Sequence, residues 1–379
     1  DFDEHNSHVR RLWEDYRAGH AARVPMILGM NPRMVLMDPA LNSERITFDR
    51  YMNEPEVMAK IQLQFQHWHR HNMIQDREMG LPAEGWTLYA DPQNVWDFEW
   101  LGAKACYPPD REPYVLPTIT GENKGKYIEK PIPGPFEGPM ARGWDYYEHF
   151  KKLKGSGFTY KNIPIGEIPA PALGLDGPFT LAFGLMAEQL LLEMLTDRPF
   201  FDALMDKITT ACLERIKASR KRGNIADGKP VCLADDSICL ISVEQYKEYV
   251  LPYHKRIIAE LGRPEVTNYM HLCGDASRHF PTIRDELNVY SFDTGYPIDF
   301  AKVRRDLGEN VEIAGGVHVN LLLNGSSRQV YDEAKRILQS GIKKGGKFFL
   351  RDANNLAPRT PPDNIKAMYQ ANLDFGKYE

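Results

Sequence analysis

Hydrophobic residues recur at regular intervals along most of this chain, and the interval identifies the elements. Near the start Val9, Leu12, Trp13 and Tyr16 have helical spacing, which predicts a helix over residues 5–19 within an N-terminal helical extension, 1–22. Two further elements follow. The apolar run 24–28 predicts a buried strand, and 55–78 predicts a long helix with proline in its first turn.

Residues 100–172 break this regularity. Prolines and glycines recur among many aromatic side chains, as in Pro131-Ile132-Pro133-Gly134-Pro135. The segment is too aromatic for disorder and too interrupted for long regular elements. We predict an ordered insertion on the main fold, serving either as a lid or as structural padding.

From Leu173 onward, short apolar runs alternate with helical patterns. The predicted helices cover 180–194, 199–222, 243–262, 276–287, 298–307, 327–341 and 362–375, and the predicted strands cover 231–234, 266–271, 289–292, 311–314 and 347–350. Such alternation predicts a parallel sheet. At this length, and without a Gly-x-Gly-x-x-Gly turn, it favours a (β/α)₈ TIM barrel over an open doubly wound sheet, in a single domain over 1–379.

The overall composition excludes some classes of partner. The chain has 47 basic and 52 acidic residues, a net charge of −5, and no sustained basic stretch, so we expect no nucleic-acid partner. No apolar run reaches the roughly 20 residues that span a bilayer, so we expect no membrane segment. Five cysteines without scaffold spacing, and a start with no visible signal peptide, predict a cytoplasmic protein.

Polar residues that can do chemistry follow the predicted strands. In a barrel these ends form the face that carries the active site. Each residue also has a plainer interpretation: Cys273 as a small buried side chain, Asp293 as a helix cap, His318 as a local hydrogen-bonding group, and the two aspartates 235 and 236 as loop anchors. The strand-end residues are Asp235, Asp236, His271, Cys273, Asp293, His318, Asn354 and Asn355.

His271 and Cys273 are the most informative pair. On a strand, alternate side chains point to one face, so the imidazole and the thiol project together. Imidazole nitrogen and thiolate sulfur are typical zinc ligands. The pair, supported by the other strand-end groups, predicts a metal site.

Several motifs resemble the uroporphyrinogen decarboxylase superfamily and, within it, the corrinoid (cobalamin)-dependent methyltransferases. The resemblance implies a (β/α)₈ barrel. It also implies zinc bound through His271 and Cys273, with Asp293 in the place of the acidic ligand that similar methionine synthases use. The matching segments are Arg23-Val24-Pro25-Met26, Gly177-Pro178-Phe179-Thr180-Leu181-Ala182, Leu240-Ile241-Ser242-Val243-Glu244-Gln245-Tyr246, Tyr249-Val250-Leu251-Pro252-Tyr253-His254-Lys255, His271-Leu272-Cys273-Gly274-Asp275 and Thr360-Pro361-Pro362-Asp363-Asn364-Ile365.

One departure from the family pattern bears on the reaction. The methyltransferases carry a later cysteine near the last strand, and Asn354 stands in its place, where decarboxylases have a histidine. Losing a thiolate leaves a harder, more electrophilic ion, which suits activation of an oxygen atom. His318 or Asn354 is then expected to supply a fourth contact or to hydrogen-bond the departing oxygen, and Asp236 to handle a proton.

The sequence therefore predicts a zinc-dependent methyltransferase that demethylates an oxygen-bound donor, such as a methoxylated aromatic, a methyl ether or methanol. The acceptor is cob(I)alamin on a partner corrinoid protein, since this chain lacks an Asp-x-His-x-x-Gly cobalamin motif. Aromatic residues are expected to wall the donor pocket. The alternatives are a thiol- or folate-directed methyltransferase, a metal-free decarboxylase-like lyase and a non-catalytic binding protein. The choice of donor and the oligomeric state, including a homo-oligomer, stay open. The candidate wall residues are Trp96, Trp100, Tyr107, Tyr114, Phe136, Trp144, Tyr146 and Tyr147.

Overall fold

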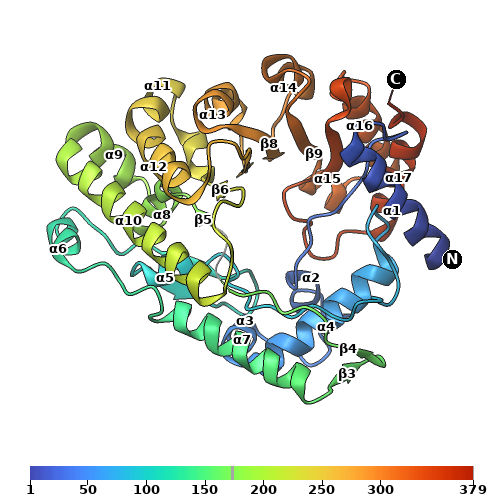
Figure 1. Cartoon of the computed structure of the whole chain (residues 1–379), viewed down its shortest axis with the longest axis horizontal. Helices are drawn as coiled ribbons and strands as arrows, with labels where there is room; N and C mark the ends of the chain where they lie inside the picture. Colours follow the sequence, from blue (N-terminus) through green and yellow to red (C-terminus); the bar gives the residue numbers. More distant parts are fainter. Residues whose placement is uncertain (172–174, 379) are drawn as a thin grey trace.

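The protein is a ring of helices around a parallel sheet (Figure 1), seen here in a computed structural model that describes residues 1–171 and 175–378. Six strands pair in the order β10-β9-β8-β7-β6-β5, every neighbouring pair parallel. The strands are β5 (Leu175–Asp176), β6 (Cys232–Ala234), β7 (Asn268–Leu272), β8 (Val289–Thr294), β9 (Glu312–His318) and β10 (Phe348–Ala353).

The strand order identifies the winding. Consecutive strands are always neighbours, whereas a doubly wound sheet reverses its order at a switch point. The early segment 24–28 continues the sheet beyond β10, because Ile27 N donates to Leu350 O at 3.0 Å and Leu350 N donates to Pro25 O at 2.8 Å. First and last segments thus lie side by side, and the TIM-barrel-like fold predicted from the sequence is confirmed.

The ring is less regular than eight equal strands. Segment 24–28 forms a single bridge, Met26 to Leu350, in part because Pro25 has no N–H to donate. On the far side, residues 86–88 meet 165–167 through the Trp86–Ile165 bridge and two flanking hydrogen bonds.

Helices cover the outside of the sheet, and α1 packs across its N-terminal edge, where Tyr16 donates to Glu312. In the described residues no single helix is long and apolar enough to cross a bilayer; only α8 and α9 taken together reach that length, and they are bent by 111°. The α-helices of the barrel are α1 (Phe2–Ala18), α2 (Arg33–Leu36), α3 (Phe48–Asn53), α4 (Pro55–Asn72), α5 (Trp96–Trp100), α8 (Pro178–Met186), α9 (Gln189–Thr196), α10 (Arg198–Arg222), α11 (Val243–Gln245), α12 (Leu251–Leu261), α13 (Phe280–Leu287), α14 (Phe300–Leu307), α15 (Val319–Asn324), α16 (Ser327–Leu338) and α17 (Pro362–Phe375); the 3₁₀-helices are η1 (Asp236–Leu240), η3 (Ser277–His279) and η4 (Lys344–Gly346), and η2 (Tyr246–Val250) is a π-helix.

The aromatic insertion contains regular elements, and the expectation that it lacks long ones is wrong. It contains the 17-residue helix α7 (Pro139–Gly155), with proline at its first turn, where the missing N–H costs nothing. Its last residue, 172, lies outside the described residues. The other elements are the hairpins β1 (Lys104–Cys106) with β2 (Tyr114–Leu116) and β3 (Thr159–Tyr160) with β4 (Ile163–Pro164), and α6 (Lys124–Glu129).

Two predicted helices end early because tertiary contacts take their backbone groups. The helix predicted over 180–194 breaks at Ala187, because Leu185 O accepts hydrogen bonds from Thr118 N and Ile119 N in the insertion. In a continuous helix that carbonyl would accept from residue 189. Similarly, α4 stops at Asn72 rather than residue 78, and Asp76 N donates to Met26 O instead.

Candidate metal centre

Three side chains with metal-binding atoms meet at the C-terminal ends of β6 and β7. One potential ligand atom from each of Asp236, His271 and Cys273 lies within 4.8 Å of the other two. Nitrogen, sulfur and oxygen donors of these kinds are those that zinc takes in proteins. Asp236 belongs to η1, directly after β6, so the barrel's strand order delivers all three groups to one place.

The turn after β7 holds Cys273 in position. Asp236 Oδ1 accepts a hydrogen bond from Cys273 N at 2.7 Å. Gly274 follows in the left-handed region with φ of 69°. Gly295, in the neighbouring loop, lets this turn approach closely, because a Cβ there would lie 2.5 Å from Gly274 N.

His271 is oriented from its other ring nitrogen. Asp293 Oδ2 lies 2.7 Å from His271 Nδ1, and Cys273 Sγ lies 3.1 Å from Nε2. Burial opposes charge on the ring, but the hydrogen bonds from Asp293 and Cys273 outweigh it and raise the pKa of His271 to about 10. Because a carboxylate engages Nδ1, Nε2 is the ring nitrogen that is left to bind a metal ion beside Cys273.

Asp293, which the sequence predicted as a ligand, is held differently. Its Oδ2 also accepts from Arg351 Nη1 at 2.6 Å and from Tyr269 OH at 3.4 Å. It does not belong to the group of three within the described residues, and Asp236 does. The geometry therefore favours Asp236 as the oxygen ligand and Asp293 as the group that orients His271.

Within the described residues His318 does not belong to the group of three, and Asn354 has contacts of its own. His318 ends β9 and stacks on Tyr296, with ring centroids 3.9 Å apart, and burial lowers the pKa of its imidazole. Asn354 follows β10 with φ of 110°, and its carbonyl accepts from Arg351 Nη2 at 3.3 Å.

Asp235 is an anchor rather than part of the site. Its buried carboxylate accepts hydrogen bonds from Phe179 N at 3.2 Å and Thr180 N at 2.6 Å, in the first turn of α8. His254 Nε2 lies 2.7 Å from the same group. Asp235 therefore has the loop-anchoring role alone, whereas Asp236 anchors the turn at Cys273 and also belongs to the group with His271 and Cys273.

Sequence reasoning missed three residues around the centre. Arg351 pairs with Asp293, and Tyr269 stands two residues before His271 on the same strand face. Burial, followed by the charges of Asp236 and other neighbours, raises the pKa of Cys239. The sequence could have indicated Cys239 by its position three residues after Asp236, because side chains at i and i+3 of a 3₁₀-helix lie on one side.

A cavity of about 310 Å³ lies beside β6, with Cys232 and Ala234 of that strand in its wall. Ala234, one of its wall residues, is the register neighbour of His271. Of the aromatic residues expected to wall a pocket, Trp96 is the one that lines this cavity among the described residues.

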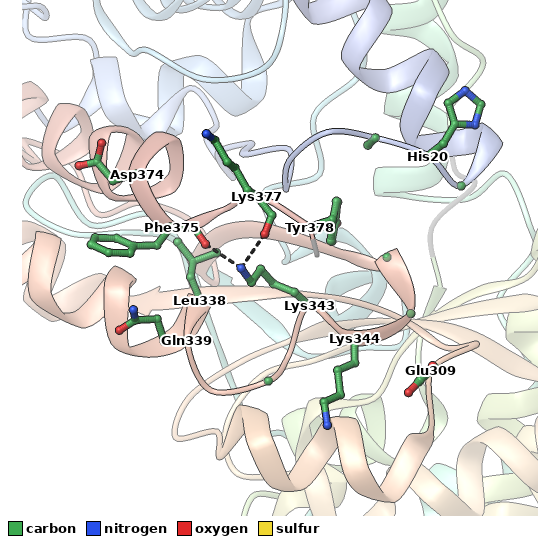
Figure 2. Close-up of a pocket in the computed structure, with 15 residues that line it drawn as sticks. His20, Glu309, Leu338, Gln339, Lys343, Lys344, Asp374, Phe375, Lys377 and Tyr378 are labelled. Carbon is green, nitrogen blue, oxygen red and sulfur yellow. Dashed lines mark hydrogen bonds between the residues drawn. The ribbon is translucent and has the colours of Figure 1, made fainter.

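A second pocket lies at the other end of the strands (Figure 2). It has a volume of about 1190 Å³ and is lined in part by Glu309 and Lys344, which precede β9 and β10. There Lys343 Nζ donates to the carbonyls of Phe375 and Lys377, at 2.8 and 2.6 Å. In TIM barrels chemistry lies at the opposite face, so size alone does not make this pocket a catalytic site.

Comparisons with known proteins bear on the family and the fold. The sequence model of the uroporphyrinogen decarboxylase (URO-D) family matches residues 168–373, which include Asp236, His271 and Cys273. A solved structure of a methyltransferase from Methanosarcina mazei has a TM-score of 0.65 at 18% identity, covering 97% of this chain and 98% of that one. At this identity the match supports the fold.

Three curated relatives carry functional names. The chain is 34% identical to the methylated-thiol–coenzyme M methyltransferase of Methanosarcina mazei, over 37% of this chain and 36% of that protein. It is 27% identical to the methylcobamide:CoM methyltransferase MtbA of Methanosarcina acetivorans, over 54% and 58%. It is also 27% identical to the uroporphyrinogen decarboxylase of Geobacter sulfurreducens, over 53% and 59%. The chain thus spans less than two thirds of each of these relatives.

Proposed function

Because this chain belongs to the uroporphyrinogen decarboxylase (URO-D) family, we propose that it is a zinc-dependent methyltransferase that moves a methyl group from an oxygen-bound donor to cob(I)alamin on a partner corrinoid protein. The resemblance to the superfamily and to its corrinoid methyltransferase branch is confirmed by the matches to the family and to the Methanosarcina methyltransferases. The metal, the donor and the partner belong to the proposal.

The observation that carries the proposal is the group formed by Asp236, His271 and Cys273. Its donor set suits zinc, and its single thiolate leaves the ion more electrophilic than a site with two. When bound there, zinc supplies Lewis acidity toward an oxygen atom of the donor.

The protein's own side chains prepare the site for that chemistry. Asp293, fixed by Arg351, holds Nδ1 of His271, and Asp236 fixes the backbone of Cys273. During transfer the O–CH₃ bond breaks and a Co–CH₃ bond forms on the corrinoid co-substrate, which provides the electron pair. The departing oxygen keeps the O–CH₃ pair and takes up a proton. His318 and Asn354 remain our candidates for contacts to that oxygen.

Thiol-directed transfer is the second candidate function. The relative from Methanosarcina mazei is named for a methylated thiol, and methyl donors of that kind are therefore a required comparison. The two candidates are separated by offering a methoxylated aromatic and a methylated thiol to the protein with cob(I)alamin. We expect methylcobalamin to form with the ether only, as followed by its absorbance spectrum.

Metal content is the first measurement. Plasma mass spectrometry on protein purified without added metal or chelator should give about one zinc per chain, lost in His271→Ala and retained in the control His20→Ala, whose side chain is exposed. Absence of zinc from the unaltered protein would contradict the proposal and favour a metal-free lyase.

A further inference from the structure

The cavity beside β6 has the position of a donor-binding site. Asp176, Ala234 and His271 are register neighbours on β5, β6 and β7, so they form one row across the sheet. Adjacent strands are ~4.8 Å apart, which separates the outer two by roughly 10 Å. The small side chain of Ala234 stands between them and forms part of the cavity wall. A ligand in the cavity therefore meets Asp176 and Ala234, one strand away from His271.

The cavity wall combines apolar surface with a few polar groups. Val95, Met140 and Pro171 contribute apolar surface, and Trp96 contributes an aromatic one. The volume of about 310 Å³ is at the lower end of ligand pockets, which range over roughly 300–1,000 Å³. A single substituted ring is the class of ligand that such a space accepts.

Trp96 lines this cavity through ring carbon atoms, because its polar atom is buried. Its side chain is 4% exposed, and within residues 1–171 and 175–378 its indole Nε1 has no hydrogen-bond partner. Buried donors normally have partners, since leaving one unpaired costs free energy. Because Nε1 is closed off from the cavity, a ligand there would meet the indole ring and not its N–H group.

The charged groups of the cavity select against anions. Arg215, the one guanidinium among the wall residues that the structure describes, is ion-paired to Asp97, with Nη2 3.0 Å from Oδ1. Asp176 adds a second carboxyl group. Burial, followed by the charges of Asp97 and Asp236, raises the pKa of Asp176 to about 7. A carboxylate on the ligand would meet acidic groups and a guanidinium that is already ion-paired to Asp97. A neutral hydroxyl would instead find an acceptor in Asp176.

We propose that this cavity binds the methyl donor and selects a methoxylated phenol, whose hydroxyl donates to Asp176 and whose ring packs against Trp96. This inference rests on the proposed function and names the substrate class of the same site. Asp176 acts here as a specificity-determining residue, which the sequence analysis did not single out.

Calorimetric binding to the zinc-loaded protein tests the assignment with three probes: 2-methoxyphenol, 1,2-dimethoxybenzene and 2-methoxybenzoate. We expect 2-methoxyphenol to bind most tightly and 2-methoxybenzoate least. Asp176→Leu should weaken 2-methoxyphenol roughly tenfold and leave 1,2-dimethoxybenzene within about twofold, because that probe has no hydroxyl to donate. Trp96→Phe should weaken both ethers several-fold.

Matched variants keep the test independent of folding. Asp363→Asn and Trp68→Phe remove the same groups outside the cavity and should leave all three affinities unchanged. Asp176→Asn, which retains an acceptor, should lose less than Asp176→Leu. Equal weakening of the two ethers in Asp176→Leu, or tightest binding of 2-methoxybenzoate, would overturn the assignment.

The two proposals fail separately. If 2-methoxyphenol binds with this variant pattern but yields no methylcobalamin with cob(I)alamin, the binding site stands and the proposed reaction is wrong. If the ether is demethylated with a KM that Asp176→Leu does not change, the reaction stands and the site assignment is wrong.

Discussion

At the residue scale, the candidate metal centre is organised by the contacts that hold one imidazole. His271 has Asp293 on one ring nitrogen and Cys273 on the other, and Asp293 is itself paired with Arg351. A carboxylate behind a metal-binding histidine fixes the ring and increases its basicity. Such a group affects metal affinity without touching the ion.

Asp293→Ala separates an orienting role from a ligand role. We expect zinc affinity, measured by competition with a chelator, to fall about 10- to 100-fold, because His271 loses its partner at Nδ1. Asp236→Ala should reduce affinity further, as His271→Ala does, and Asp363→Ala should have no effect. If Asp293→Ala abolished binding as completely as His271→Ala, Asp293 would be a ligand, as the sequence alone predicted.

At the element scale, the junction of β6 and η1 gives two adjacent aspartates different tasks. Asp235 points to the first turn of α8, where two backbone N–H groups need acceptors, and Asp236 faces the group with His271. Chain direction changes between them, since β6 ends at Ala234 and the 3₁₀-helix η1 begins at Asp236.

Substituting these aspartates one at a time should separate stability from metal binding. In chelator, Asp235→Ala should lower the free energy of unfolding by about 3 kcal/mol, because it leaves His254 and two N–H groups of α8 without an acceptor. Urea denaturation measures this, and zinc per chain should be unchanged. Asp236→Ala should lower the zinc content per chain and leave the free energy of unfolding unchanged. Loss of zinc with full stability in Asp235→Ala would refute the division of roles.

The packing of η3 against η1 makes stability depend on pH. His279 is fully buried, its Nε2 lies 2.9 Å from Ile238 O, and burial followed by the charge of Arg278 lowers its pKa to about 4. Between the ordinary pKa of about 6.5 and this value, the unfolded chain binds a proton that the folded chain excludes. The contribution is therefore present above pH 6.5 and is lost as the pH falls toward 4.

His279→Gln should reveal this term. Urea denaturation measures the free energy of unfolding at pH 6.5 and at pH 5. For the unaltered protein this free energy should fall between the two, with about 1 kcal/mol per pH unit contributed by His279. In the variant the free energy should fall by correspondingly less. His20→Gln, at an exposed position, serves as the control and should retain the original slope. Identical slopes in all three proteins would rule out the buried neutral histidine.

At the scale of the whole molecule, one buried ion pair joins the start of the ring to its end. Asp76 accepts from Arg23 Nη1 and Nη2 at 2.6 and 2.7 Å, from Met26 N at 2.7 Å and from Tyr369 OH at 2.9 Å. These partners come from the first strand segment and from α17. The cluster ties together segments nearly 350 residues apart in sequence.

Asp76→Asn should weaken this closure without reaching the metal centre. We expect a loss of about 3–5 kcal/mol in the free energy of unfolding, because a buried guanidinium loses its counter-charge. Thermal and urea denaturation measure the loss, and zinc per chain should stay at the unaltered value. Asp363→Asn, on an exposed side chain, should stay within ~0.5 kcal/mol. Stability equal to that control would show that the pair contributes nothing net.

The sequence by itself determined the repeating strand–helix pattern, the TIM-barrel-like fold and the adjacency of His271 and Cys273. Each follows from local periodicity: alternation on a strand places two residues on one face, and apolar spacing defines each helix. The end of the last helix at Phe375 was predicted for the same reason.

Only the tertiary structure decided where helices break and which carboxylate lies with His271 and Cys273. The break at Ala187 arises from donors 66 or more residues earlier, which take the carbonyl of Leu185. Likewise, Asp236 and Asp293 both follow or end strands and look equivalent in sequence. Arg351 engages Asp293, whereas η1 turns Asp236 toward Cys273. Distances between such groups depend on strand register and on side chains from distant segments, which local patterns do not encode.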